Sequence, residues 1–230
     1  MVVLSLGGSL IVDERGVNVA YLKKFIALIK REVQHGKKFL IVCGGGATAR
    51  VYDRAAAALN PRVPELDLHW VGIYGCHINE ELLRVSFGKL AEVHDASERA
   101  HPSRLKFRRP VVIGRVGTPG ISSDGGTIEW AHAVRAKTVY NLTNVDGVYD
   151  RDPHKHKGAK HIPKLTWKQF SKQFGTGRWK PNAHAPFAPV AGQMAERWGI
   201  SAVIIDGADL NNLKRALDGK PFRGTTLTNR

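Results

Sequence analysis

Short apolar runs recur along the chain, and glycine residues follow closely behind several of them. Residues 2–6 and 39–43 are almost wholly apolar, and Gly7-Gly8 and Gly44-Gly45-Gly46 come directly after them. Apolar runs of about four to eight residues that end in turn residues are typical of buried strands. The same pattern predicts further strands at residues 111–113, 138–142 and 202–205.

The stretches between these runs have the spacing of amphipathic helices. The clearest helix carries apolar residues from Leu22 to Ile29, with Asn18 as its N-cap and Gly36 at its end. Further helices are predicted around residues 55–58 and at residues 80–88, 124–135, 186–198 and 209–217. Strands that alternate with helices favour an α/β fold, in which a mainly parallel central sheet has helices on both faces, a three-layer αβα sandwich.

We expect a single domain over residues 1–230, because the alternation continues along the whole chain. Glycine and proline residues punctuate the chain between residues 115 and 123. This segment is the expected boundary between an N-terminal lobe of about residues 1–115 and a C-terminal lobe of about residues 116–230.

The chain is strongly basic. It has 35 lysine and arginine residues and 20 aspartate and glutamate residues, which gives a formal net charge of +15. Such a field attracts phosphorylated molecules. The basic residues are spread out and form no long block of the kind expected of a nucleic-acid-binding tail, so a nucleic acid is not the favoured partner. Two cysteines exclude a disulfide framework, and no apolar run approaches the roughly 18 residues of a membrane span. We therefore expect a cytoplasmic protein without a membrane partner.

Glycine turns after predicted strands are the first candidates for chemistry. The turns are Gly7-Gly8-Ser9, Gly44-Gly45-Gly46 and residues 114–123. Glycine lets a phosphate approach the backbone, and a helix that starts just after the turn directs free N–H groups at the anion. Parallel sheets bind ligands at the carboxyl ends of their strands, so that these turns can face one crevice. None is a Walker A loop or a G-x-G-x-x-G fingerprint, which argues against a P-loop kinase and a dinucleotide enzyme.

A longer motif identifies a family. Residues 141–153 read N-L-T-N-V-D-G-V-Y-D-R-D-P, which resembles the T-N-V-D-G-V-Y-x-x-D-P signature that lies beside ATP in the amino-acid-kinase family. Five further segments resemble, in order, motifs of the archaeal-type uridylate kinases within that family: G-G-S-L at 7–10, C-G-G-G-A-T-A-R at 43–50, G-T-P-G-I-S-S-D at 117–124, A-P-F-A-P-V-A at 185–191 and F-R-G-T at 222–225. The resemblance runs from residue 3 to about residue 226.

The resemblance implies the amino-acid-kinase fold and the transfer of the γ-phosphoryl group of ATP to UMP. It also implies Mg²⁺ as a companion of ATP, with no metal site made by protein residues alone, and a homo-oligomer. The residues implied in catalysis are Asp124, Arg50, Gly8 and Lys180. Those implied in ATP binding are Gly7, Gly8, Ser9, Gly46, Thr143, Asn144, Asp146, Tyr149 and Asp152. Those implied in acceptor binding are Gly45, Arg50, His69, Thr118, Ser122 and Ser123.

Departures from the family pattern concern the acceptor more than ATP. Ser5 stands where many members have a lysine, and Arg50, Arg178 and Lys180 are candidates to replace that cation. His69 replaces an aspartate expected at the acceptor nucleoside, and Cys76-His77 replaces Thr-Arg. Three alternatives to a UMP kinase stay open: a kinase of the same fold for another phosphorylated or carboxylated acceptor, a non-catalytic nucleotide-binding regulator or storage protein, and an RNA-binding role.

Overall fold

The computed structural model describes residues 1–151, 156–176 and 186–230. Within these residues a central sheet has eight strands in the order β10-β12-β11-β7-β1-β4-β6-β5. Their bounds are β1 Val2–Leu6, β4 Phe39–Cys43, β5 Ala91–His94, β6 Val111–Gly114, β7 Thr138–Thr143, β10 Lys164–Thr166, β11 Ser201–Asp206 and β12 Thr225–Thr228. Two small antiparallel pairs lie outside this sheet: β2 (Val12–Asp13) with β3 (Gly16–Val17), and β8 (Val148–Tyr149) with β9 (His161–Ile162).

The first strand of the chain lies in the middle of the sheet. Strand β1 pairs in parallel with β4 on one side and β7 on the other, and Leu6 lies beside both Cys43 and Leu142. Strand β6 continues the parallel order next to β4. The carboxyl ends of these strands therefore reach the same edge of the sheet, where parallel sheets bind ligands. Only the β11–β12 pair within the sheet is antiparallel among the described residues.

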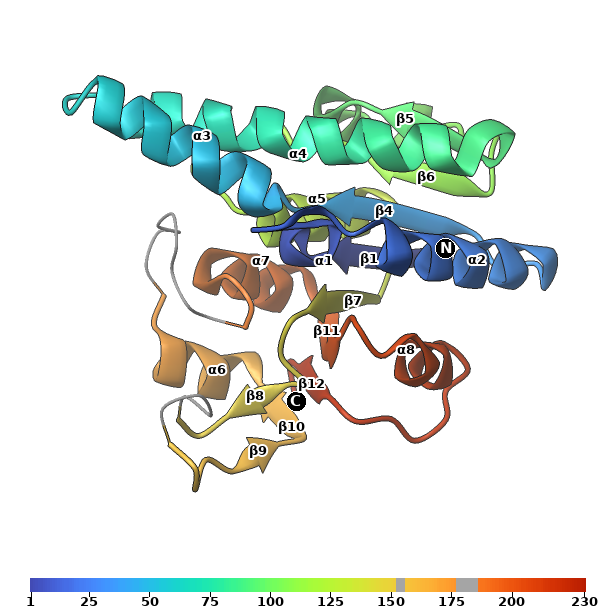
Figure 1. The fold of residues 1–230 in the computed structure, drawn as a ribbon. Coiled ribbons are helices and arrows are strands. Elements are labelled where there is room, and N and C mark those ends of the chain that lie inside the picture. The colour runs from blue at the N-terminus through green and yellow to red at the C-terminus, as the bar shows by residue number, and fades with distance from the viewer. Residues whose placement is uncertain (152–155, 177–185) are drawn as a thin grey trace.

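Helices cover both faces of the sheet (Figure 1). The helices are α1 Gly8–Ile11, α2 Val19–Gln34, α3 Gly46–Leu59, α4 Glu65–Phe87, α5 Ser123–Ala133, α6 Trp167–Phe174, α7 Pro189–Trp198 and α8 Leu210–Leu217. Successive strand residues point to opposite faces, so Val3 packs with the core under α5, α6 and α7, while Leu4 packs with the core under α2 and α8. Figure 1 shows α3 and α4 side by side along one edge of the molecule. The predicted three-layer α/β sandwich is confirmed.

The strongest sequence signals are found where they were expected. The strands predicted at residues 2–6 and 39–43 have those bounds, and the other three predicted strands are one or two residues longer. Asn18 is the N-cap of α2, since its side chain accepts a hydrogen bond from the Tyr21 N–H at 3.1 Å. The helix predicted at residues 80–88 begins much earlier, at Glu65, because two glycines inside α4 weaken its apolar pattern.

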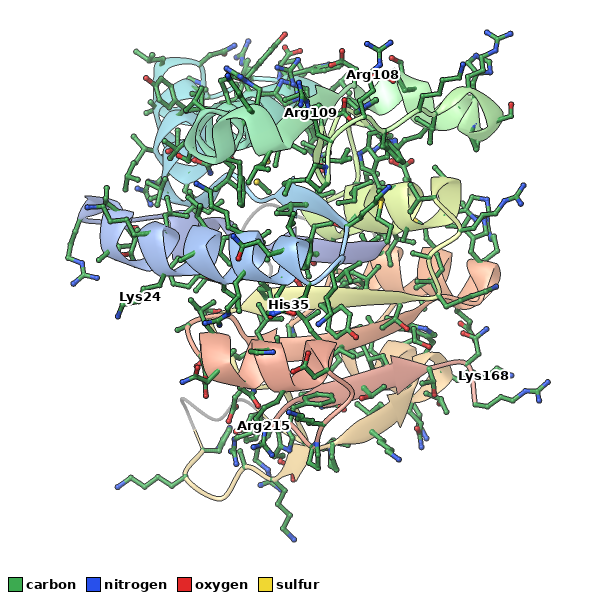
Figure 2. The ribbon with its side chains drawn as sticks, turned by 90° about the vertical axis from the view of Figure 1, so that its right-hand side faces the viewer. Lys24, His35, Arg108, Arg109, Lys168 and Arg215 are labelled. Atoms are coloured by element: carbon green, nitrogen blue, oxygen red, sulfur yellow. The ribbon has the colours of Figure 1, made fainter. Side chains whose placement is uncertain are left out.

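Basic side chains come from several separate elements of the fold. Figure 2 shows Lys24 on α2, Lys168 on α6 and Arg215 on α8 well apart from one another, and the neighbouring Arg108 and Arg109 in the segment before β6. Among the described residues, no helix is long and apolar enough to cross a membrane.

Candidate active site

Two glycine turns meet at the carboxyl edge of the sheet. The first follows β1 and the second follows β4. A Cβ atom added at Gly8 would collide with the Gly46 backbone nitrogen, and Gly46 itself has a φ of +62°. Glycine is required at both positions, because one backbone packs directly on the other and an L-residue rarely adopts that φ. Helix α3 begins at Gly46, so the first-turn N–H groups of this helix have no partner within it.

Helix α4 holds the second turn and the neighbouring loop in place. The buried Asn79 side chain donates to the Gly44 carbonyl at 2.7 Å. On either side of Asn79 in the helix, His77 Nε2 lies 2.8 Å from the Val116 carbonyl oxygen, and Glu80 Oε1 accepts a hydrogen bond from the Val116 N–H at 3.2 Å. These contacts make α4 a common support for the glycine turn after β4 and for the loop after β6.

Asp124 lies in the first turn of α5 and ties three elements together. Its Oδ1 accepts a hydrogen bond from the Ser5 hydroxyl in β1 at 3.2 Å, and its Oδ2 accepts one from the Ala188 N–H before α7 at 3.0 Å. Burial raises the pKa of the Asp124 carboxyl, and the two hydrogen bonds offset this rise only in part. Within the described residues Asp124 has no ion pair, and in β1 its partner is the Ser5 hydroxyl.

These elements surround a cleft of about 510 Å³. Ten of the residues implied by the resemblance line it, and they come from six segments of the chain. They are Ser9, Gly45, Gly46, Arg50, His69, Thr118, Ser122, Ser123, Asp124 and Asn144. The cleft therefore brings together most of the predicted acceptor and catalytic residues, although they are spread over more than one hundred positions of the sequence.

The wall of the cleft opposite the sheet is the α3–α4 hairpin. The two helices approach closely where a Cβ atom added at Gly75 would lie 2.9 Å from the Ala49 Cα. At Gly72, by contrast, an added Cβ would meet nothing within 4 Å, although this glycine lines the cleft. Gly75 thus allows the helices to pack, and Gly72 keeps the cleft open.

Other predicted ATP-binding residues lie outside this cleft. The Tyr149 hydroxyl donates to Asp146 Oδ1 at 2.7 Å, and Arg223 from the far end of the chain pairs with the same carboxylate. These hydrogen bonds lower the pKa of Asp146 against the effect of burial. Gly7, Gly8 and Thr143 are likewise absent from the lining, and Asp152 and Lys180 lie outside the described residues. Their roles stay predictions.

Two features of the site were missed by reasoning from the sequence. Asp53 lines the cleft from α3, one turn beyond Arg50, and it belongs to no motif. Arg99 is also nearly buried, where it pairs with Glu129 at 2.9 Å and donates to the Thr118 hydroxyl at 3.1 Å. Helical spacing from Arg50 could have indicated Asp53 as a neighbour on the same helix face. No signal in the sequence pointed to Arg99.

Comparison with known proteins agrees with this architecture. The sequence model of the amino acid kinase family matches residues 1–206. The uridylate kinase of Methanoregula boonei is 32% identical over 221 residues, which cover 94% of this chain and 90% of the relative. The uridylate kinase of Methanothrix thermoacetophila is 32% identical over 95% of this chain and 96% of its own length. The crystal structure of uridylate kinase from Archaeoglobus fulgidus superposes with a TM-score of 0.80 at 28% identity, covering 99% of both chains.

Proposed function

Because the chain belongs to the amino-acid-kinase family, we propose that it is an ATP-dependent kinase that converts UMP to UDP. The relatives that match it over nearly their full length are named uridylate kinases. The observation that carries the proposal is the contact between the turns at Gly8 and Gly46, together with the cleft that Ser9, Gly46 and Arg50 line beside this contact. Two phosphate-binding backbones that touch are suited to hold a donor and an acceptor phosphate next to each other.

The reaction needs charge neutralisation more than proton transfer. The second pKa of a phosphate monoester is near 6, so the acceptor oxygen of UMP is already ionised at neutral pH and needs no general base. Backbone N–H groups of the glycine turns and of the first turn of α3 stabilise the negative charge that spreads over the transferring group. Arg50 binds the acceptor phosphate with its planar fork of donors.

In the proposed mechanism, Asp124 holds neighbouring parts of the site in place. Its carboxylate holds Ser5 beside the first glycine turn and the Ala188 backbone at the start of α7. Substrates enter a site whose strands and helices are already fixed, so little reorganisation is needed as charge develops. Gly8 contributes its backbone to the same arrangement. Lys180 completes the catalytic set that we propose.

The remaining roles follow the two halves of the reaction. The acceptor half comprises Gly45, Arg50, His69, Thr118, Ser122 and Ser123. The ATP half comprises Gly7, Gly8, Ser9, Gly46, Thr143, Asn144, Asp146, Tyr149 and Asp152. In this division, residues 1–115 form the acceptor lobe and residues 116–230 the ATP lobe of one domain. The glycine turns at residues 7–9 and 46 reach across to ATP, and the 117–124 turn reaches across to the acceptor.

In the proposed function, Mg²⁺ binds together with ATP. The described residues contain no cluster of three or more histidine, cysteine, aspartate or glutamate side chains that could hold a metal ion by themselves. Mg²⁺ usually binds through substrate phosphates and water, with few protein ligands. When bound, the ion neutralises charge on the β- and γ-phosphates. We place the activity in the cytoplasm, where nucleotides are available and where Cys43 and Cys76 stay reduced.

An exposed apolar stripe on α4 supports a homo-oligomer. Leu66, Trp70, Tyr74 and Ile78 are exposed and follow one another at four-residue spacing, which places them along one face of the helix. Contiguous exposed apolar surface of this kind marks interfaces between proteins. We propose that a second copy of the chain covers it. The Tyr74→Arg variant should have a lower mass than the natural protein in light scattering after gel filtration, and an unchanged mass would contradict the proposed interface.

A coupled ADP-release assay tests the proposed function. ATP and Mg²⁺ are combined with UMP, CMP, AMP, GMP or a small phosphorylated acceptor, and UMP should give the highest kcat/KM. Arg50→Ala should lower kcat/KM for UMP by about a hundredfold. Arg54→Ala is the matched control, because Arg54 is exposed one turn further along α3. No turnover of any nucleoside monophosphate by the natural protein would refute the kinase assignment.

A further inference from the structure

The outer end of the cleft is formed by one side chain from each helix of the α3–α4 hairpin. Four cleft-lining residues of α3 have the spacing i, i+3, i+4, i+7, and four of α4 have the same spacing: Gly46, Ala49, Arg50 and Asp53, and His69, Gly72, Ile73 and Cys76. This spacing places each set on one helix face. Ala49 contacts Gly75 at the inner end, so the last member of the α3 set, Asp53, and the first member of the α4 set, His69, lie together at the outer end.

Asp53 has unused capacity to accept a hydrogen bond. Its Oδ1 is buried without a hydrogen-bond partner in the described part of the chain. Burial raises the pKa of Asp53, and the nearby His69 opposes that rise. The His69 side chain is only 10% exposed, and its Nε2 lies 3.7 Å from Glu65 Oε1. His69 therefore lies between two carboxylates, and its position favours the ionised, hydrogen-bond-accepting form of Asp53.

The Asp53 carboxylate can bind only certain groups of a nucleotide. An ionised carboxylate accepts hydrogen bonds and repels phosphate. In a nucleoside monophosphate the donors are the sugar hydroxyls and N–H groups of the base. Asp53 follows Arg50 by three residues, a rise of about 4.5 Å along α3. If Arg50 binds the acceptor phosphate, this step reaches the sugar, which is joined directly to that phosphate, before it reaches the base.

We propose that Asp53, supported by His69, recognises a ribose hydroxyl of the acceptor nucleotide and makes the protein select ribonucleotides over 2′-deoxyribonucleotides. This inference rests on the proposed function, because it takes Arg50 as the phosphate ligand. It assigns to Asp53 a role in specificity that no motif in the sequence indicates. The effect is expected mainly in KM, because a hydroxyl contact far from the transferring group stabilises ground state and transition state alike.

The test compares UMP with 2′-deoxy-UMP in the natural protein and in Asp53→Ala. The natural protein should prefer UMP in kcat/KM. Asp53→Ala should lower kcat/KM for UMP by about ten- to a hundredfold and leave the value for 2′-deoxy-UMP nearly unchanged, since only UMP loses a hydrogen bond. Asp67→Ala is the control: Asp67 is an exposed carboxylate two positions before His69, outside the cleft lining, and its removal should leave the preference intact.

Moving the carboxylate gives a second measurement. In the double variant Asp53→Ala/His69→Asp, a carboxylate returns to the same end of the cleft from the facing helix, and part of the preference for UMP should return. An equal loss for both nucleotides in Asp53→Ala, or a natural protein that does not discriminate between them, overturns the inference. If the natural protein turns over neither nucleotide, the proposed function fails instead. Calorimetric titration with both nucleotides then decides the inference: tighter UMP binding that Asp53→Ala abolishes supports it, and equal or absent binding overturns it.

Discussion

Glu80 is a buried glutamate whose surroundings disfavour the negative charge of its ionised carboxylate, and this makes the stability of the protein depend on pH. The side chain is fully buried in α4 behind the loop that follows β6. Burial raises its pKa to about 8 from an ordinary value of 4.5, although the Val116 N–H and Arg115 favour the ionised form. Arg115 Nε and His77 Nε2 lie 4.0 and 3.9 Å from its Oε2, and neither is within hydrogen-bond distance. The folded protein therefore keeps a proton that the unfolded chain releases.

This difference predicts how stability depends on pH. Between pH 4.5 and about 8 the unfolded state binds fewer protons at this site, so the free energy of unfolding falls as pH rises, by about 1.4 kcal/mol per pH unit. Glu80→Gln cannot ionise, and its amide oxygen can still accept the Val116 N–H. From about pH 5.5 to about pH 7.5, the free energy of unfolding of this variant should therefore gain roughly 2.7 kcal/mol relative to the natural protein.

Urea unfolding followed by tryptophan fluorescence measures this gain, because other titrating groups cancel between the two proteins. Glu81→Gln is the control. Its neighbour Arg84 lowers the pKa of the exposed Glu81, so the stabilisation from this pair is already complete above pH 4.5 and should not change over the same range. If the difference in the free energy of unfolding between Glu80→Gln and the natural protein stays constant with pH, Glu80 is ionised in the folded protein. This result would refute the predicted protonation of Glu80.

Three further substitutions test the site. Gly72→Ala should raise the free energy of unfolding, measured in urea, by about 0.5–1 kcal/mol, because alanine is the better helix former. The added methyl group enters the open cleft and should raise KM for UMP. An unchanged KM would mean that the acceptor binds elsewhere. Asp124→Asn should lower kcat by about a hundredfold with little change in ATP binding, and unaltered turnover in the steady-state assay would remove Asp124 from the mechanism. Tyr149→Phe should weaken ATP binding less than Tyr149→Ala if the ring packs on the nucleotide, and equal losses in calorimetry would assign the effect to the hydroxyl bonded to Asp146.

The sequence predicted the parts of the fold whose signals are local. Apolar runs before glycines located the central strands, and the side-chain acceptor of Asn18 located the start of α2. Strands β5, β10 and β12 were not predicted, because their burial depends on neighbours that come from distant parts of the chain. In β10, for example, Lys164 is exposed and only its pairing with Thr226 makes it part of the sheet.

The site shows the same division between local and distant information. Motifs indicated Gly46, Arg50 and Asp124 because glycine turns and helix starts have local requirements. At position 69 the sequence revealed only that a carboxylate is missing, whereas the structure places Asp53 beside His69 from the facing helix. Such a juxtaposition depends on how closely two helices pack, and that closeness is set here by Ala49 against Gly75. Spacing along one helix carries no information about the partner helix.

The position of β12 has a consequence for how the protein is made. This strand, at residues 225–228, lies between β10 and β11, and the Thr225 hydroxyl accepts the Val148 N–H and donates to the Ile162 carbonyl. Residues 225–228 are synthesised after the residues of all the other strands of the sheet. Until they emerge, β10 has no neighbour to join and β11 ends the sheet with an open edge, which in a nascent chain invites pairing with other chains. Folding of this half must therefore wait until residues 225–228 have left the ribosome, and the edge of β11 stays exposed in the nascent chain until then.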